Sequence, residues 1–283
     1  MPGFIVIEQG NLCNLKCKSC PTRLGLRPKG YMKPDAFKDI INQFVKHDRN
    51  FINRRLVLHG YGEPLLSPYL WENLDYLEKL NFSKVDFLDN GMLMTEEMAR
   101  ILCKYKCLNW IKISLNSSNK ETMEYINTGS NFDVVVENIK KLCDVVKECG
   151  QPFGIKVQLM HTSKNKDEKK SDIVKLIGRD NFSVLECTIQ NLPDTDLAND
   201  LLIPEYEFIG GGCIFAGQSM LIHWDGDIVG CCLDNSKGQV IGNVRDGIFS
   251  KMVQDNLSRL RSEFMDKNFK NLPACSTCTG VKK

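Results

Sequence analysis

Three cysteines near the N-terminus, Cys13, Cys17 and Cys20, have the residue type and the spacing for metal chemistry. Thiolates hold iron–sulfur clusters and zinc, and such close spacing lets one loop bring three sulfur atoms to one centre. Four cysteines normally hold a [4Fe-4S] cubane, so a set of three leaves one iron open to an outside ligand. A zinc knuckle that lacks a ligand, or three unrelated buried cysteines, are the alternatives that the residues leave open.

A second group of cysteines lies in the last 71 residues and comprises Cys213, Cys231, Cys232, Cys275 and Cys278. Cys275 and Cys278 have the spacing of a metal-ligand pair. Four cysteines suit zinc in a ribbon-like site as well as an iron–sulfur cubane, so the residues alone leave the metal open. The other five cysteines lie among apolar neighbours and are expected to be packing residues; these are Cys103, Cys107, Cys143, Cys149 and Cys187.

The first cysteine group follows a short apolar segment. Five similar segments recur along the chain, and each is followed by a longer stretch whose apolar residues repeat at helical spacing. This alternation is typical of repeated βα units. The predicted strands are Phe4 to Glu8, Arg55 to His59, Lys84 to Leu88, Trp110 to Leu115, Gly154 to Leu159 and Ser183 to Ile189. They predict an α/β fold, a partial (β/α)6 TIM-like barrel whose site lies at the carboxyl ends of parallel strands.

After about residue 190 the pattern changes. Asn191 to Glu207 lacks sustained periodicity and is the predicted linker. Beyond it we expect a hairpin, with strands Met220 to Trp224 and Ile228 to Cys231 around the turn Asp225-Gly226-Asp227, and one helix around Ile248 to Phe264. The chain is therefore divided into a barrel domain, residues 1–205, and a small C-terminal α+β domain, residues 206–283.

The overall composition excludes several classes of protein. Lys and Arg number 37 against 35 Asp and Glu, a formal charge of +2 that is too balanced for a nucleic-acid binder. No apolar run approaches the roughly 18 to 20 residues of a membrane span, and the N-terminus has no signal-peptide pattern. We expect a cytoplasmic protein with neither a membrane nor a nucleic-acid partner. Thirteen cysteines in such a chain favour metal or thiol chemistry over disulfides.

The Cys-x3-Cys-x2-Cys pattern of Cys13, Cys17 and Cys20 after the first strand resembles the radical S-adenosylmethionine (SAM) superfamily. The segment Tyr61-Gly62-Glu63-Pro64 is similar to the family's Gly-Gly-Glu-Pro motif, which contacts the amino group of SAM. The resemblance implies a [4Fe-4S] cluster on the three cysteines and a SAM site that includes Gly62, Glu63, Asn90, Ser114 and Asn116. Ser19 stands where the family usually has an aromatic residue, so the adenine contact is left to backbone atoms.

The cysteine intervals of the C-terminal part resemble the twitch domain, a shortened relative of the SPASM domain. This resemblance implies a second [4Fe-4S] cluster held by Cys213, Cys231, Cys275 and Cys278. Across nearly the whole chain the sequence also resembles the radical SAM aminocyclitol dehydrogenases that act on 2-deoxy-scyllo-inosamine. The same motifs occur in SPASM and twitch proteins with other substrates.

Two enzymatic hypotheses follow from the resemblance, and both need a low-potential electron donor such as flavodoxin or ferredoxin. In the first, a sugar or cyclitol alcohol is oxidised, Asp234 acts as the base and the second cluster accepts an electron. In the second, a peptide is epimerised or cross-linked without net oxidation, and Cys232 donates a hydrogen atom in the epimerase version. Because the first strand begins at about Phe4, we expect no N-terminal domain for binding a peptide leader.

A third hypothesis is a metal-binding or regulatory protein without activity, which the intact Cys13, Cys17, Cys20 and Glu63 disfavour. Asp234 has an alternative role as a turn residue, and Cys232 as a bystander beside the cluster. Four further residues are expected to be structural. His59 and His223 are expected to be hydrogen-bonded in the fold, and Arg27 and Lys29 to be exposed loop charges.

Overall fold

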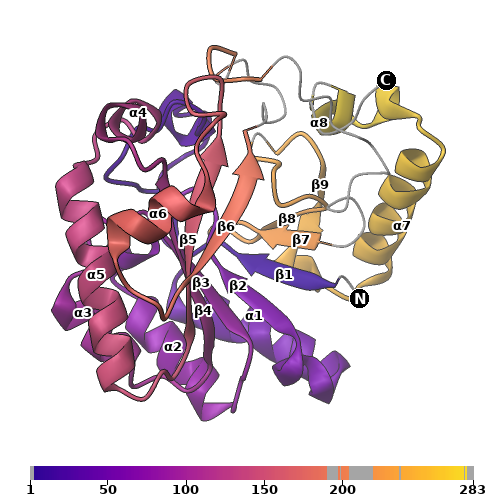
Figure 1. The fold of residues 1–283 in the computed structure, drawn as a ribbon. Coiled ribbons are helices and arrows are strands. Elements are labelled where there is room, and N and C mark those ends of the chain that lie inside the picture. The colour runs from indigo at the N-terminus through magenta and orange to yellow at the C-terminus, as the bar shows by residue number, and fades with distance from the viewer. Residues whose placement is uncertain are drawn as a thin grey trace.

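The computed structural model describes residues 3–189, 197, 199–203, 219–235, 237–276 and 278. Its central element is a nine-stranded sheet in the order β6-β5-β4-β3-β2-β1-β7-β8-β9 (Figure 1). The strands are β1 Phe4–Ile7, β2 Arg55–Leu58, β3 Val85–Asp89, β4 Leu108–Asn116, β5 Gly154–His161, β6 Ser183–Thr188, β7 Ser219–Ile222, β8 Asp227–Val229 and β9 Val240–Asn243.

Helices follow most of the strands in sequence. The α-helices are α1 Pro34–His47, α2 Leu70–Lys79, α3 Glu96–Leu102, α4 Lys120–Ile126, α5 Phe132–Glu148, α6 Lys170–Ile177, α7 Lys251–Met265 and α8 Pro273–Ser276. Short 3-10 helices are η1 Pro21–Leu24, η2 Arg49–Asn53, η3 Pro64–Leu66, η4 Val244–Asp246 and η5 Phe269–Asn271. Within the described ranges, no helix has both the length and the apolar character to cross a membrane.

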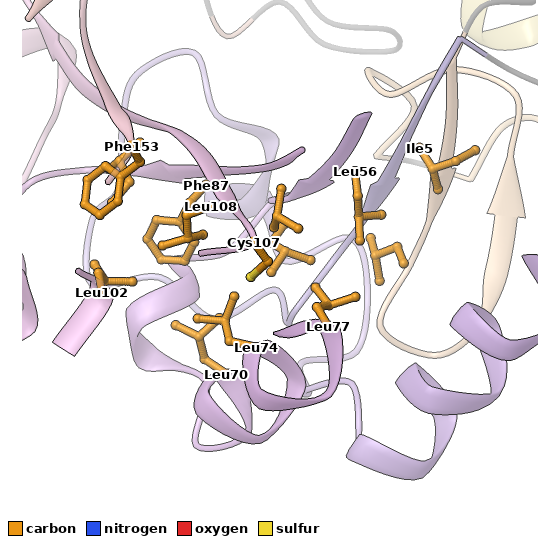
Figure 2. Close-up of a cluster of buried hydrophobic side chains, with 14 of the residues drawn as sticks. Ile5, Leu56, Leu70, Leu74, Leu77, Phe87, Leu102, Cys107, Leu108 and Phe153 are labelled. Carbon is orange, nitrogen blue, oxygen red and sulfur yellow. The ribbon is translucent and has the colours of Figure 1, made fainter. Parts of the chain in front are cut away.

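The first six strands are parallel, each paired with its neighbour in sequence, as in a partial barrel. The predicted order, type and approximate bounds of these strands are confirmed. Alternate residues along each strand face opposite sides of the sheet. Ile5 and Leu56 pack in the large core beneath the helices, where Leu70, Leu74 and Leu77 of α2 are directed at the sheet (Figure 2).

The other face of the sheet is the inside of the barrel. Val6 and Val57 belong there to a separate small cluster with Tyr61, Leu221 and Val229. The side chains that alternate with the main core residues therefore surround the barrel's interior, below the carboxyl ends of the strands. Parallel strands covered by helices are usually apolar on both faces, so polar side chains on this inner face are candidates for function.

The helical spacing of apolar residues in the sequence predicts a helix from Asn131 to Cys149, with Asn131 as its N-cap and Gly150 as its stop, and the structure confirms it as α5. Asn131 caps it, because its side-chain oxygen accepts a hydrogen bond from Val134 N at 3.0 Å. Gly150, at φ 78°, follows the helix in the left-handed conformation that glycine adopts without strain. The apolar residues expected on the inner face of this helix are all buried; they are Val135, Ile139, Leu142 and Val146.

The predicted C-terminal hairpin is present as β7 and β8, which pair antiparallel around Gly226 at φ 90°. Strand β7 also pairs parallel with β1, so the hairpin continues the barrel sheet (Figure 1). Strand β9 is an element that the sequence analysis missed, because Gly242 and Asn243 break its apolar pattern. The predicted domain boundary at 205/206 and most of the predicted linker lie outside the described residues, so the division into two domains stays a proposal.

Candidate functional site

The first cysteine loop connects β1 to η1 and is held by backbone hydrogen bonds to other elements. Lys16 N donates to Thr128 O at 2.8 Å, and Lys18 N donates to Ile126 O at 2.9 Å, so the loop is fixed to the end of α4. Glu63 N donates to Leu12 O at 2.8 Å. The loop and the Tyr61–Pro64 segment therefore share one edge of the sheet, at the carboxyl ends of β1 and β2.

The thiols of this loop lie in an environment that disfavours negative charge. Burial raises the pKa of Cys13 to about 11 and that of Cys17 to about 12, and neighbouring thiols add to both shifts. Without a positive centre these groups are neutral, whereas an iron–sulfur cluster binds thiolates. Leu15 N also donates to Cys13 Sγ at 3.4 Å, a contact of the kind that tunes cluster sulfurs. The donor set therefore fits a cluster.

A single metal ion would need a tighter arrangement. Within the residues that the structure describes, no three His, Cys, Asp or Glu side chains converge as the ligands of one ion do. The cysteines of a cubane bind different iron atoms and stand further apart than the ligands of one zinc.

Glu63 and Asp89 form a pair of buried carboxyl groups beside the cysteine loop. Glu63 accepts hydrogen bonds from Leu65 N at 3.2 Å and from Asn90 N at 3.0 Å. Burial, together with the negative charge of Asp89, raises the pKa of Glu63 well above its usual range. Two buried carboxyls in contact favour a cation at this position, and the ammonium group of an amino acid supplies one.

Gly62 lets this segment approach the cysteine loop closely. A Cβ atom at residue 62 would lie 2.3 Å from Gly10 O and 2.7 Å from Leu12 O, which are both backbone atoms. A side chain here would push the segment away from the loop, so glycine is required by packing. Close packing therefore explains why a glycine stands at this position of the predicted SAM motif.

The remaining predicted SAM contacts lie at the carboxyl ends of β3 and β4. Asn90 Nδ2 donates to Asn14 Oδ1 at 2.8 Å and lies 3.9 Å from Cys13 Sγ, so the structure brings Asn90, Glu63 and Cys13 together. Asn116 has φ 70° and donates to Asn127 Oδ1 at 2.8 Å. Ser114 O accepts from Asn127 Nδ2 at 2.9 Å, so Asn127, which the sequence analysis missed, fixes the end of β4.

The turn after β8 links two members of the second cysteine group, Cys231 and Cys275. Gln239 Nε2 lies 3.9 Å from Cys275 Sγ, and Gln239 N donates to Asp234 Oδ2 at 2.8 Å. Leu233 N donates to Cys231 Sγ at 3.4 Å. The turn therefore connects Cys231 with Cys275 on α8. Of the other two predicted ligands, Cys278 lies within the described residues and Cys213 lies outside them.

Asp234 is fully buried within this turn. Its Oδ1 accepts from Gly238 N at 3.0 Å and its Oδ2 accepts from Gln239 N at 2.8 Å. These contacts support the turn role, and the role of base stays a hypothesis. Cys232, in contrast, lines a cavity inside the barrel.

This cavity has a volume of about 370 Å³. Tyr61, of the predicted SAM motif, lines it beside Cys232, of the second cysteine group. Tyr61 Oη donates to Cys232 O at 3.3 Å. Tyr61 belongs to a small apolar cluster, and Cys20 and Cys232 both pack against that cluster. The cavity therefore borders one residue next to the predicted SAM contacts, Tyr61, and one residue of the second cysteine group, Cys232.

A buried ionic network centred on Glu8 was not expected from the sequence. Arg27 donates to both oxygens of Glu8, at 3.0 and 2.7 Å, and to Asn235 Oδ1. Arg27 is 7% exposed, so the expectation that it is an exposed loop charge was wrong. A buried carboxylate at the end of β1 needs a cation, and the loop folds inward to supply one. The signal available was a charged residue, Glu8, within an apolar strand.

His223 and the backbone complete this network. His223 Nδ1 lies 3.3 Å from Glu8 Oε2, and Trp224 N donates to the same oxygen at 3.1 Å. The structural role expected for His223 is thus supported. Burial alone would raise the pKa of Glu8, but the hydrogen bonds of His223 and Arg27 lower it to about 2.

Replacing Glu8 by Gln is expected to destabilise the chain by about 3 to 5 kcal/mol at pH 7, because Arg27 loses its buried partner. A carboxylate whose pKa is lowered on folding stabilises the fold at pH values above its ordinary pKa of 4.5, and the stabilisation is lost as pH falls towards about 2.

Thermal unfolding of the cluster-free chain, measured as a function of pH, tests this prediction. The difference between wild type and Glu8→Gln should stay constant above pH 5 and shrink below it. An unchanged difference in acid would contradict the assignment. The exposed Glu72→Gln is the control.

The comparisons with known proteins identify the family of the chain. Residues 7–163 match the radical SAM superfamily. The chain belongs to this superfamily, and it is a radical SAM enzyme. Residues 213–279 match the SPASM iron–sulfur cluster-binding domain, so the chain combines a radical SAM barrel with a C-terminal SPASM domain.

Individual relatives have different functions. The mycofactocin maturase MftC of Mycobacterium tuberculosis is 28% identical over 153 residues, which cover 54% of this chain and 36% of MftC. The structure of BtrN in complex with AdoMet and 2-DOIA has a TM-score of 0.68 at 17% identity and covers 99% of this chain and 94% of BtrN. Streptococcus suis SuiB bound to its precursor peptide SuiA has a TM-score of 0.61 at 18% identity, covering 99% and 70% of the two chains. These similarities confirm the predicted partial barrel and leave the substrate open.

Proposed function

We propose that this radical SAM enzyme oxidises an alcohol group of a sugar or cyclitol to a carbonyl. The observation that carries the proposal is the cavity of about 370 Å³ between Tyr61 and Cys232. It is within the range of small-molecule sites, roughly 300 to 1,000 Å³, and close to its lower end. Tyr61, which precedes the predicted SAM contact Gly62, and Cys232, which follows the predicted ligand Cys231, both line it. The likeness to BtrN, a 2-DOIA dehydrogenase, supports the same reading.

In this proposal Cys13, Cys17 and Cys20 hold one [4Fe-4S] cluster, and Cys213, Cys231, Cys275 and Cys278 hold a second. When bound, these groups and SAM supply a 5'-deoxyadenosyl radical and an acceptor for one electron. Glu63 holds the ammonium group of SAM, and Gly62, Asn90, Ser114 and Asn116 shape the rest of its site. A low-potential donor such as flavodoxin or ferredoxin supplies the first electron.

The oxidation balances as follows. When bound, SAM would supply the radical that takes one hydrogen atom from the substrate carbon, and the second cluster would accept the one electron that the substrate loses together with its O–H proton. Asp234 remains the sequence-based hypothesis for the proton acceptor. The barrel's walls keep water from the radical and hold the reacting carbon in place.

The position of Cys232 favours a second candidate function, a redox-neutral epimerisation. Its thiol would return a hydrogen atom to the substrate, and the thiyl radical so formed would regain the thiol by taking one electron from the low-potential donor and one proton. Cys232 lines the cavity, which a bystander of the cluster need not do. The structure of SuiB with a bound precursor peptide supports a peptide as the substrate in this case.

Replacing Cys232 by Ala separates the two functions. Under the dehydrogenase proposal, carbonyl formation from cyclitols and hexoses should change by less than about twofold, because no hydrogen atom is returned to the substrate. Product mass spectrometry measures this in D2O, where a thiol donor would place one solvent deuterium on the product. Turnover of a peptide substrate that is lost in Cys232→Ala, with deuterium in the wild-type product, would instead support the epimerase. Cys187→Ala and the iron content of each variant serve as controls.

A further inference from the structure

Two lysines stand side by side on the inner wall of the barrel. Lys112 of β4 and Lys156 of β5 are direct partners in the parallel pairing of these strands. Directly paired residues of neighbouring strands project from the same face of a sheet. Ile111 and Ile113, which alternate with Lys112, pack in the core under the helices. Both lysines therefore project inward, and both line the cavity of about 370 Å³.

Neither lysine has a carboxylate partner among the described residues. Lys112 Nζ donates to the neutral Gln158 Oε1 at 2.5 Å, and Lys156 Nζ lies 3.9 Å from the centre of the Trp110 ring. Asp86 is the one acidic residue among the described residues lining this cavity, and it pairs with Arg55 and accepts from Asn109. The cavity wall thus has two positive charges that the described residues do not neutralise.

Adjacent like charges are unfavourable, and more so where water is limited. Burial, with the charges of Arg55 and Lys156, lowers the pKa of Lys112. An anion between the two lysines would remove this repulsion and satisfy several N–H donors at once.

His59 adds a polar group to the same wall. It lines the cavity, and its buried Nδ1 atom has no hydrogen-bond partner among the described residues. Burial, together with the charge of Lys112, lowers the pKa of His59 to about 3, so its ring is neutral and can donate one hydrogen bond from the suitable tautomer. The expected hydrogen bond of a structural histidine is thus not seen at Nδ1, and a bound acceptor would supply it.

We infer that the cavity binds an oxyanion of the substrate, a phosphate or a carboxylate, at Lys112 and Lys156 with His59 nearby. This inference rests on the proposed function, since it specifies the sugar or cyclitol that would be oxidised. Tyr61 and Cys232 border the part of the cavity left for the neutral carbon skeleton. A protonated amine, as in an aminocyclitol, would be repelled by the same two lysines.

The test is equilibrium binding to the reconstituted enzyme with SAM, measured by calorimetry for glucose, glucose 6-phosphate and gluconate. At least one anionic probe should bind about tenfold or more tightly than glucose, as expected for a charge-assisted contact of about 1.5 to 3 kcal/mol. The phosphate and the carboxylate arms show which oxyanion is preferred. Lys112→Gln should remove this preference, and Lys112→Arg should keep most of it.

Three comparisons keep the result interpretable. Lys175→Gln, at an exposed position of α6, is the matched control and should leave every affinity unchanged. Lys156→Gln gives a second variant, should Lys112→Gln fail to fold or to keep its iron. Equal affinity of the wild type for glucose and both anions, or unchanged anion binding in a folded lysine variant, overturns the inference.

The inference and the proposed function fail differently. Carbonyl formation from neutral sugars without any preference for anions would overturn the anion site alone. Lysine-dependent anion binding without oxidation of any alcohol would support the anion site and contradict the dehydrogenase.

Discussion

Replacing Cys13, Cys17 and Cys20 together by alanine is expected to lower the iron content from about eight to about four atoms per chain. It should also abolish reductive cleavage of SAM. The three cysteines lie in one loop fixed to α4 and to the Tyr61–Pro64 segment, so their loss should remove the first cluster as a whole. Cys231 and Cys275 are connected separately by the turn at Asp234, and the cluster proposed for the C-terminal cysteines should persist.

Iron, acid-labile sulfide and zinc in anaerobically prepared protein measure this result. The matched control replaces Cys103, Cys149 and Cys187, which are neither motif residues nor fully buried. This control should keep all the iron and the full rate of 5'-deoxyadenosine formation. A triple variant of the first group with unchanged iron would contradict the assignment of the first cluster.

The metal left in the variant also decides between the proposed functions. About four irons would keep the second cluster as an electron acceptor, which alcohol oxidation requires. Zinc without iron would make the C-terminal site structural, because zinc has no redox chemistry. Redox-neutral chemistry with Cys232 as the donor would then become the better hypothesis.

The strands could be predicted from the sequence because apolar runs bounded by helical segments identify parallel strands directly. Strand β9 was missed because Gly242 weakens its pattern. The cysteine ligands and Glu63 could be predicted from the sequence because they belong to short motifs of closely spaced residues. Arg27 was wrongly expected to be exposed, because its partner Glu8 is distant in sequence and only the folded loop brings the two charges together.

The charged wall of the cavity is also visible in the sequence, as an alternation of residue types along two strands. In Trp110-Ile111-Lys112-Ile113 and Lys156-Val157-Gln158-Leu159, polar or aromatic residues alternate with aliphatic ones. Buried parallel strands are usually apolar on both faces, so this alternation indicates a polar barrel interior. That Lys112 and Lys156 are direct neighbours depends on the register of β4 and β5, which the sequence does not specify.

Replacing Glu63 by Gln is expected to weaken SAM binding by roughly 30-fold or more, since losing one partner of a buried charge pair costs about 2 to 5 kcal/mol. The glutamine keeps the size of the side chain but removes the charge proposed to hold the ammonium group of SAM. Its amide nitrogen also cannot accept one of the hydrogen bonds that Leu65 N and Asn90 N now donate. Anaerobic binding of SAM to the reconstituted variant, with its iron content, measures the effect.

The capping of η3 by Glu63 raises an alternative role, because Leu65 N donates to the same side chain. If Glu63 only stabilised this turn, Glu63→Gln would lower the unfolding temperature but bind SAM as tightly as the wild type does. If it holds the ammonium group, the folded variant should retain its iron, lose affinity for SAM and form 5'-deoxyadenosine slowly. Glu72→Gln, which removes an exposed carboxylate on α2, should change neither property. The binding constant, rather than the stability, therefore distinguishes a SAM ligand from a structural cap.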